Sequence, residues 1–416
     1  MPGDVPGDDP GRGQNPFGLP GGGQNPFGFD MTEIMRMLQS PGPVNMEVAR
    51  TTAQTMATVD LDTGQQQPEP PVSNTDEHAY DDVVRAVGHM VAETTGISAA
   101  LTLPARGVAR SEWSRTTLTG LEPVLGALAT ALGRSNAAGV EPDATAPFSQ
   151  DALFGMVMQQ IVPLLLGAWA GSMIGMLSHR TLGQYDLPLP LEGAPTLVFV
   201  VPNVESFAKE WSLPAEQLQH ALALREVVHG AQRAVPWVRT RLVRLASAYV
   251  SAYEVNPQAI EEQLGDTGFD PNDPSAMEAM ARLSDPEMLL GAMRSDHQAP
   301  LLEELQRFVS VLEGYTDIVV EMLGPRVVGE HGRIDEALRR HRLDKGDATE
   351  FVDRLLGLEL DRGHYDAGVA FCRGVIERTD GNLDALNRIW TDEAMVPTTS
   401  ELEAPGLWLA RIDLPS

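Results

Sequence analysis

The sequence has one cysteine, Cys372, which excludes an internal disulfide. It lies beside Phe371 in a helical stretch, a setting typical of a buried structural thiol rather than a nucleophile. There is no Gly-x-Ser-x-Gly elbow and no glycine-rich phosphate loop, so neither serine-hydrolase chemistry nor phosphate binding by such a loop is indicated. The N-terminus shows no basic region followed by an apolar run. Together with the lone cysteine, this predicts a cytoplasmic protein.

Positive charge is also scarce. Against 58 Asp and Glu residues there are only 30 Lys and Arg, which gives a formal net charge of −28 over 416 residues. Nucleic acids and anionic membrane surfaces carry the same sign, so both are disfavoured as partners. A peptide or protein partner remains open.

One long segment has no charge at all. Ala152 to Ser178 contains Gly167, Gly171 and Gly175 at intervals of four, a spacing that fits either a membrane helix or a buried helix with close backbone contacts. Polar Gln residues and Pro163 interrupt the run, and no basic cluster flanks it. We therefore predict a helix buried in a large core and no membrane span.

Composition divides the chain into three parts. Residues 1–29 are rich in Gly, Pro and Asn and repeat an Asn-Pro-Phe-Gly element, which predicts a disordered tail. Residues 30–72 are expected to form N-terminal helices and a linker, and residues 73–416 one helical domain. The acidic segment Gly265–Pro274 lacks the spacing of a calcium-binding hand and is expected to be a solvated turn.

Hydrophobic periodicity predicts a mainly α fold, that is, α with minor β. One strand stands out, because residues 196–201 form a short apolar run between loop signals. Prolines and glycines break the helical pattern from Gly183 to Pro195. The N-terminal half should contain helices at Met31–Leu38, Met46–Val59 and Asp76–Thr95.

The segment most informative about chemistry is a helix in Glu216–Arg239, which Pro214 allows to begin and Pro236 should end. Leu218 and Leu222 share one face of it with Arg225, His229 and Gln232, at spacings of three and four residues. The leucines mark this face as buried. Arg225 and His229 should therefore point into the protein, with Glu226 beside them.

This spacing is that of His-Glu-x-x-His, in which two histidines one turn apart hold zinc and the glutamate is the general base. Here the string reads Arg225-Glu226-Val227-Val228-His229. A guanidinium has no lone pair to donate, so one zinc ligand is missing and Zn²⁺ binding is in question.

A second helix at Pro300–Leu323 carries two carboxylates on an otherwise apolar face, Glu313 and Asp317. Many zincins take their third zinc ligand from a Glu on a later helix, with an Asp four residues on supporting the first histidine. The spacing of Glu313 and Asp317 fits that arrangement, but it equally fits an exposed acidic pair.

Several segments carry a family resemblance. They are Gly183–Pro190, the Arg225-Glu226-x-x-His229 string with Val235–Arg239, Leu312–Gly314, Gly357–Leu360, Leu386–Trp390 and Asn25–Phe29. In these the chain resembles the zincin-like hydrolases, or zinc-dependent metalloproteases, of actinobacteria over nearly its whole length. The resemblance implies a mostly helical zincin-like fold. It also implies that Glu226 matches the general base, His229 a zinc ligand and Glu313 the third ligand.

Three interpretations follow from the departure at Arg225. A histidine from elsewhere could replace the missing ligand; His220 is on the wrong side of its helix, which leaves His179, His297 or His364. Alternatively, Arg225 replaces the metal and pairs with Glu313 or Asp317, as in a pseudoenzyme. In the third interpretation, the scaffold is a non-catalytic binding or regulatory module.

Overall fold

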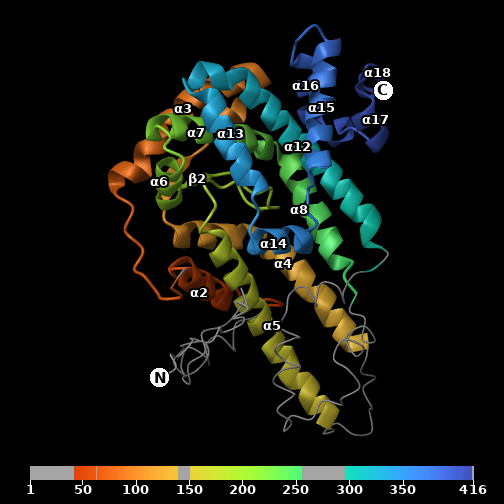
Figure 1. Cartoon of the computed structure of the whole chain (residues 1–416). Helices are drawn as coiled ribbons and strands as arrows, with labels where there is room; N and C mark the ends of the chain where they lie inside the picture. Colours follow the sequence, from red (N-terminus) through yellow and green to blue (C-terminus); the bar gives the residue numbers. More distant parts are fainter. Residues whose placement is uncertain (1–41, 62, 139–149, 255–294, 296, 415–416) are drawn as a thin grey trace, which may run out of the picture.

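The computed structural model describes residues 42–61, 63–138, 150–254, 295 and 297–414 (Figure 1). It is mainly α with a minor β component, as the sequence predicted. The strands are β1 (Ala105–Val108) and β2 (Leu197–Val200). The helices are α2 (Met46–Ala57), α3 (Asn74–Thr95), η1 (Ser98–Thr102), α4 (Arg110–Ala138), α5 (Gln150–Leu177), α6 (Val201–Glu210), α7 (Ala215–Ala234), α8 (Pro236–Ser251), α12 (Gln298–Val327), α13 (His331–Leu343), α14 (Asp347–Leu356), α15 (Arg362–Arg378), α16 (Asp384–Asn387), η2 (Arg388–Thr391), η3 (Glu393–Met395), α17 (Thr399–Glu403) and α18 (Pro405–Ile412).

The small sheet lies inside the helical core. β1 and β2 run parallel, and Gly107 pairs with Phe199. All four residues of β2 are buried, which explains why its sequence is an unbroken apolar run. Tyr80 of α3 stacks on Phe199 with ring centroids 4.0 Å apart. The expected strand is thus confirmed, whereas the short partner β1 has no comparable signal in the sequence.

Helix α5, which contains most of the charge-free segment, packs against α2, as Figure 1 shows. A methyl group at Gly167 would lie 2.3 Å from the main-chain oxygen of Asn45, which caps α2, and one at Gly171 would lie 2.3 Å from that of Ala49 in α2. The glycines therefore allow this approach. The predicted close backbone contacts are confirmed for the part of α5 from Gly167 to Gly175, which lies against α2. Within the described ranges, no helix has the length and apolarity needed to cross a membrane.

The close contact predicts a specific stability effect. Gly171→Ala should lower the free energy of unfolding by about 1–3 kcal/mol, because its methyl group meets the main-chain oxygen of Ala49. Gly133→Ala in α4 is the matched control, since nothing lies within 4 Å of the added methyl group. It should be neutral or stabilising by up to about 1 kcal/mol through helix propensity. Thermal denaturation of both variants checks this; equal midpoints would contradict it.

Helix α7 is the central element for function. It packs against α3, α12 and β2, and nearly every residue from Leu218 to Arg233 is buried. Pro236 ends α7 as expected but also begins α8 directly, so the predicted segment Glu216–Arg239 contains two helices. Proline fits this first position because no helical hydrogen bond is lost there.

Three of the expected features fall outside the described residues: the tail 1–29, the helix Met31–Leu38 and the acidic segment Gly265–Pro274. Cys372 lies in α15 and is completely buried. Burial raises the pKa of its thiol, in agreement with a structural role.

Candidate functional site

Helix α7 carries an unusual number of buried polar side chains. Arg225, Glu226, His229, Gln232 and Arg233 are all buried. Burying such groups is costly unless hydrogen bonds or opposite charges compensate them. Their compensation comes mainly from α12 and from the loop that follows α5.

Arg225 joins α7 to α12 through two ion pairs. Its Nη2 lies 2.6 Å from Oε2 of Glu313, and its Nη1 lies 2.6 Å from Oδ1 of Asp317. The side chains of Arg225 and Glu313 are only 10 % and 5 % exposed. Both predicted faces therefore point inward and meet, and a charge-assisted pair of this length is strong in such surroundings.

A second arginine completes the cluster. Nη1 of Arg342, from α13, lies 3.3 Å from Oδ1 of Asp317. We call Arg225, Arg342, Glu313 and Asp317 the Arg225 cluster. Its two guanidiniums and two carboxylates balance in formal charge.

The electrostatics of the cluster depend on burial and on these arginines. Burial raises the pKa of Glu313, an effect that Arg225 only partly opposes. Burial alone would also raise the pKa of Asp317, but Arg225 and Arg342 together hold it below its usual value. Burial alone would lower the pKa of Arg225, but Asp317 and Glu313 raise it, so the guanidinium stays charged.

His229 is completely buried, and its two ring nitrogens have different surroundings. Nδ1 lies 3.1 Å from Nη1 of Arg233 and 3.4 Å from the hydroxyl of Thr316. Arginine only donates hydrogen bonds, so the shorter contact makes Nδ1 an acceptor and places the ring proton on Nε2. Nε2 has no hydrogen-bond partner in the described part of the chain and lies 3.7 Å from Oε1 of Glu313. Burial and the nearby arginines lower the pKa of His229, so the ring is neutral.

Glu226 is buried beneath the loop that follows α5. Both of its carboxyl oxygens lie 3.0 Å from the main-chain N–H of Tyr185. A methyl group at Gly183 would lie 2.6 Å from the Glu226 carboxyl carbon, so only glycine allows the loop to approach this closely. Burial raises the pKa of Glu226 to about 8, and the nearby Asp186 adds to the shift. The tyrosine ring of the same loop also covers Arg233, whose guanidinium carbon lies 4.6 Å from the ring centre.

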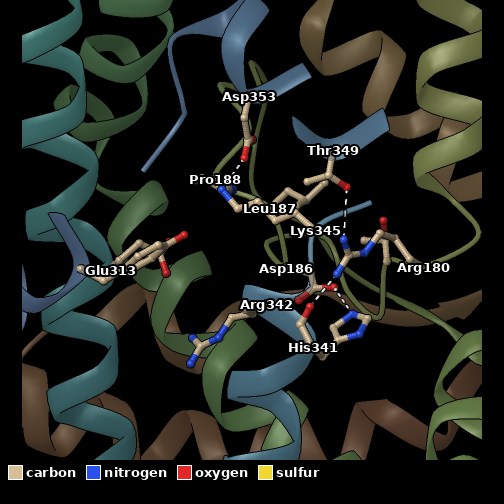
Figure 2. Close-up of a pocket in the computed structure, with 12 residues that line it drawn as sticks. Arg180, Asp186, Leu187, Pro188, Glu313, His341, Arg342, Lys345, Thr349 and Asp353 are labelled. Carbon is tan, nitrogen blue, oxygen red and sulfur yellow. Dashed lines mark hydrogen bonds and ion pairs between the residues drawn. The ribbon is translucent and has the colours of Figure 1, made fainter. Parts of the chain in front are cut away.

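A small pocket borders the cluster at Glu313 and Arg342. Its wall includes Glu313 and Arg342 together with Asp186 and His341, which lie 3.3 Å apart (Figure 2). Burial would raise the pKa of Asp186, but His341 and the N–H of Leu182 lower it to about 2. This pair belongs to the loop–α13 contact rather than to the α7 face.

A family model for zincin-like metallopeptidases matches residues 44–409. The chain belongs to this zincin-like family. A solved structure, described as a candidate hydrolase with a novel fold from Chloroflexus aurantiacus, superposes with a TM-score of 0.58 at 22% identity. The match covers 90% of this chain and 100% of that one, and it shows a shared fold. No curated protein matches the sequence significantly.

Zinc is the metal that a zincin-like metallopeptidase is expected to bind, through three protein ligands with free lone pairs. Arg225 stands at the first ligand position and binds Glu313, the candidate third ligand. His229 turns a protonated nitrogen toward Glu313, whereas a zinc-binding histidine normally donates from its other nitrogen to an acceptor. Across the described ranges, no group of three or more His, Cys, Asp or Glu side chains is placed to hold a metal. The residues present do not fit zinc.

The histidines considered as replacement ligands lie elsewhere. Nε2 of His179 is 2.9 Å from the main-chain oxygen of Met56, and His364 takes part in the N-terminal cap of α15. His297 precedes α12, about 24 Å along the helix axis from Glu313. None of them completes the zinc site in this structure.

Two residues that shape the site were not anticipated. Arg233 lies four residues after His229, so the helical spacing already placed it near that ring. Arg342 is in α13, and no local pattern indicated that it would reach Asp317. The roles of Glu226, His229 and Glu313 that the family resemblance implied remain predictions.

The raised pKa of Glu226 predicts a pH dependence. Its folded value of about 8 exceeds the ordinary 4.5, so the folded state keeps a proton that the unfolded state releases. The contribution of Glu226 to the free energy of unfolding is therefore fully present below pH 4.5 and is lost as the pH rises toward 8. Glu226→Gln, which is neutral throughout, should gain stability relative to wild type across this window, by at most about 1.4 kcal/mol per pH unit. Urea denaturation at pH 5 and pH 8 measures this gain. A difference between the two proteins that does not change with pH would contradict the prediction.

Proposed function

We propose that this zincin-like chain has lost classical zinc peptidase activity and acts as a non-catalytic binding or regulatory module. The observation that carries the proposal is the position of Arg225, which pairs with both Glu313 and Asp317. Its guanidinium supplies, between the two helices, the positive charge that a metal ion would supply there. The Arg-Glu-x-x-His string is in this view a degenerate motif.

The surroundings of Glu226 and His229 support the same conclusion. A general base must reach the proton that it removes, yet both oxygens of Glu226 bind the N–H of Tyr185. His229 accepts from Arg233 through the nitrogen that should be a donor in a zinc site. Two independent features besides Arg225 therefore oppose metal-assisted hydrolysis.

A peptide or protein is the partner class that we propose. The net charge of −28 disfavours nucleic acids as partners and favours a peptide or protein whose contacting surface is basic. In this proposal the zincin-like fold needs no metal, because the ion pairs of Arg225 compensate its buried carboxylates.

Peptide hydrolysis tests the proposal directly. Wild-type protein, with and without added zinc, should release no more fluorescence from a mixture of quenched peptides than Glu226→Gln does. Zinc-dependent hydrolysis by wild type that Glu226→Gln abolishes would contradict the proposal. It would establish instead a hydrolase that uses another metal ligand.

A further inference from the structure

A second site is an open groove of about 820 Å³ between the end of α5, α6 and α13. This volume lies within the range of small-molecule sites. Its lining includes three arginines, two aromatic side chains and two carboxylates: Arg110, Arg180, Arg340, Phe207, Trp211, Glu210 and Asp344. None of the four residues of the Arg225 cluster lines the groove, although it shares Arg180 and His341 with the small pocket beside the cluster.

Arg110 is held in place by a neutral partner. Its Nε donates to Oδ1 of Asn203 at 2.7 Å. The Asn203 amide is fixed in turn, because its Nδ2 donates to the main-chain oxygens of Ser178 and Thr181, each at 2.7 Å. The nearby carboxylate of Glu69 accepts instead from the main-chain N–H of Arg110, at 2.5 Å. Within the described residues the Arg110 guanidinium has no ion pair.

Arg180 is positioned in the same way. Its Nη1 donates to the hydroxyl of Thr349 at 3.3 Å, and its Nη2 donates to the main-chain oxygen of His341 at 2.5 Å (Figure 2). Both acceptors are uncharged. In the part of the chain that the structure describes, this guanidinium has no direct ion pair, although its charge stabilises the nearby carboxylates of Asp186 and Asp353.

The aromatic wall adds apolar contact area beside these charges, mainly through the half-buried Trp211, because Phe207 is only 5% exposed. The rings of Phe207 and Trp211 lie 5.8 Å apart, and Phe207 also contacts the ring of His341 at 5.2 Å. Two fixed guanidiniums next to aromatic rings match a ligand with an anionic group on a flat apolar body. We propose that this groove binds a small organic anion that carries a phosphate or carboxylate on a ring.

Phenyl phosphate is the probe for this site, measured by isothermal titration calorimetry on the full chain. Saturable binding is expected, and Arg110→Gln and Arg180→Gln should each weaken it by about tenfold or more. Arg110→Lys keeps the charge but not the planar fork, so its affinity should lie between those of Arg110→Gln and wild type. Arg85→Gln is the matched control, since Arg85 is exposed on α3 and should leave binding unchanged.

Three related compounds separate the two parts of the site. Phenol and benzylamine should not bind, because they lack the anion, and inorganic phosphate should bind more weakly because it leaves the rings uncovered. Absence of phenyl phosphate binding to wild type, or unchanged affinity in Arg110→Gln, would overturn the proposal. Equal affinity for phenyl phosphate and phenol would overturn it too. If Arg180→Gln does not fold, the pair Arg110→Gln and Arg110→Lys still decides.

Discussion

Replacing Arg225 by alanine is expected to lower the free energy of unfolding by about 3–5 kcal/mol. The reason is that Glu313 and Asp317 would lose the guanidinium that contacts both at 2.6 Å. Removing one member of a buried ion cluster leaves uncompensated charge, which costs more than the pair itself contributes. Urea denaturation followed by far-UV circular dichroism measures the effect.

An exposed ion pair provides the matched control. Arg339 contacts Glu336 at 2.7 Å on the surface of α13, and its side chain is 59% exposed. Arg339→Ala should cost less than about 1 kcal/mol. Arg225→Ala combined with Glu313→Gln should recover part of the lost stability, because Glu313 is then neutral and Asp317 keeps its contact with Arg342. If Arg225→Ala unfolded at the same urea concentration as Arg339→Ala, the cluster would have no structural role.

Restoring a zinc site should require two changes rather than one. Arg225→His would supply a third donor beside His229 and Glu313, but Arg233 would still donate toward Nδ1 of His229. Adding Arg233→Gln replaces that donor by a group that can accept from Nδ1. We expect the double variant to bind zinc about tenfold to a hundredfold more tightly than Arg225→His alone.

Competition with a chromophoric zinc chelator measures these affinities. Arg233→Gln by itself is the control and should bind no zinc at this site, because Arg225 remains. Equal affinities of Arg225→His and the double variant would show that Arg233 does not control the state of His229.

The sequence predicted the inward faces of α7 and α12 because helical periodicity is a local property. Once Leu218 and Leu222 marked the buried side, Arg225 and His229 had to lie on it. The same reasoning would have included Arg233, one turn beyond His229. The position of Arg233 could therefore be predicted from the sequence, whereas its effect on the ring nitrogens of His229 follows only from the three-dimensional structure.

Other parts of the site depend on contacts between distant segments. The N–H of Tyr185 that donates to Glu226 is a main-chain group, so no pattern of side chains in the sequence predicts this contact. Arg342 reaches Asp317 only because α13 packs against α12. The strand β1 was missed for a similar reason, since four residues beginning at Ala105 form a strand only beside β2. Local patterns therefore predicted helices such as α3 and α12 and the main strand, whereas tertiary packing determined these other contacts.

The most direct test of the account is the zinc content of the wild-type protein, purified without chelators and without a histidine tag. Elemental analysis should find far less than one zinc per chain, because Arg225 and Arg233 already satisfy the groups that a metal would need. Zinc near one equivalent per chain, lost on His229→Ala, would contradict the account. It would mean that the chain keeps a working metal site.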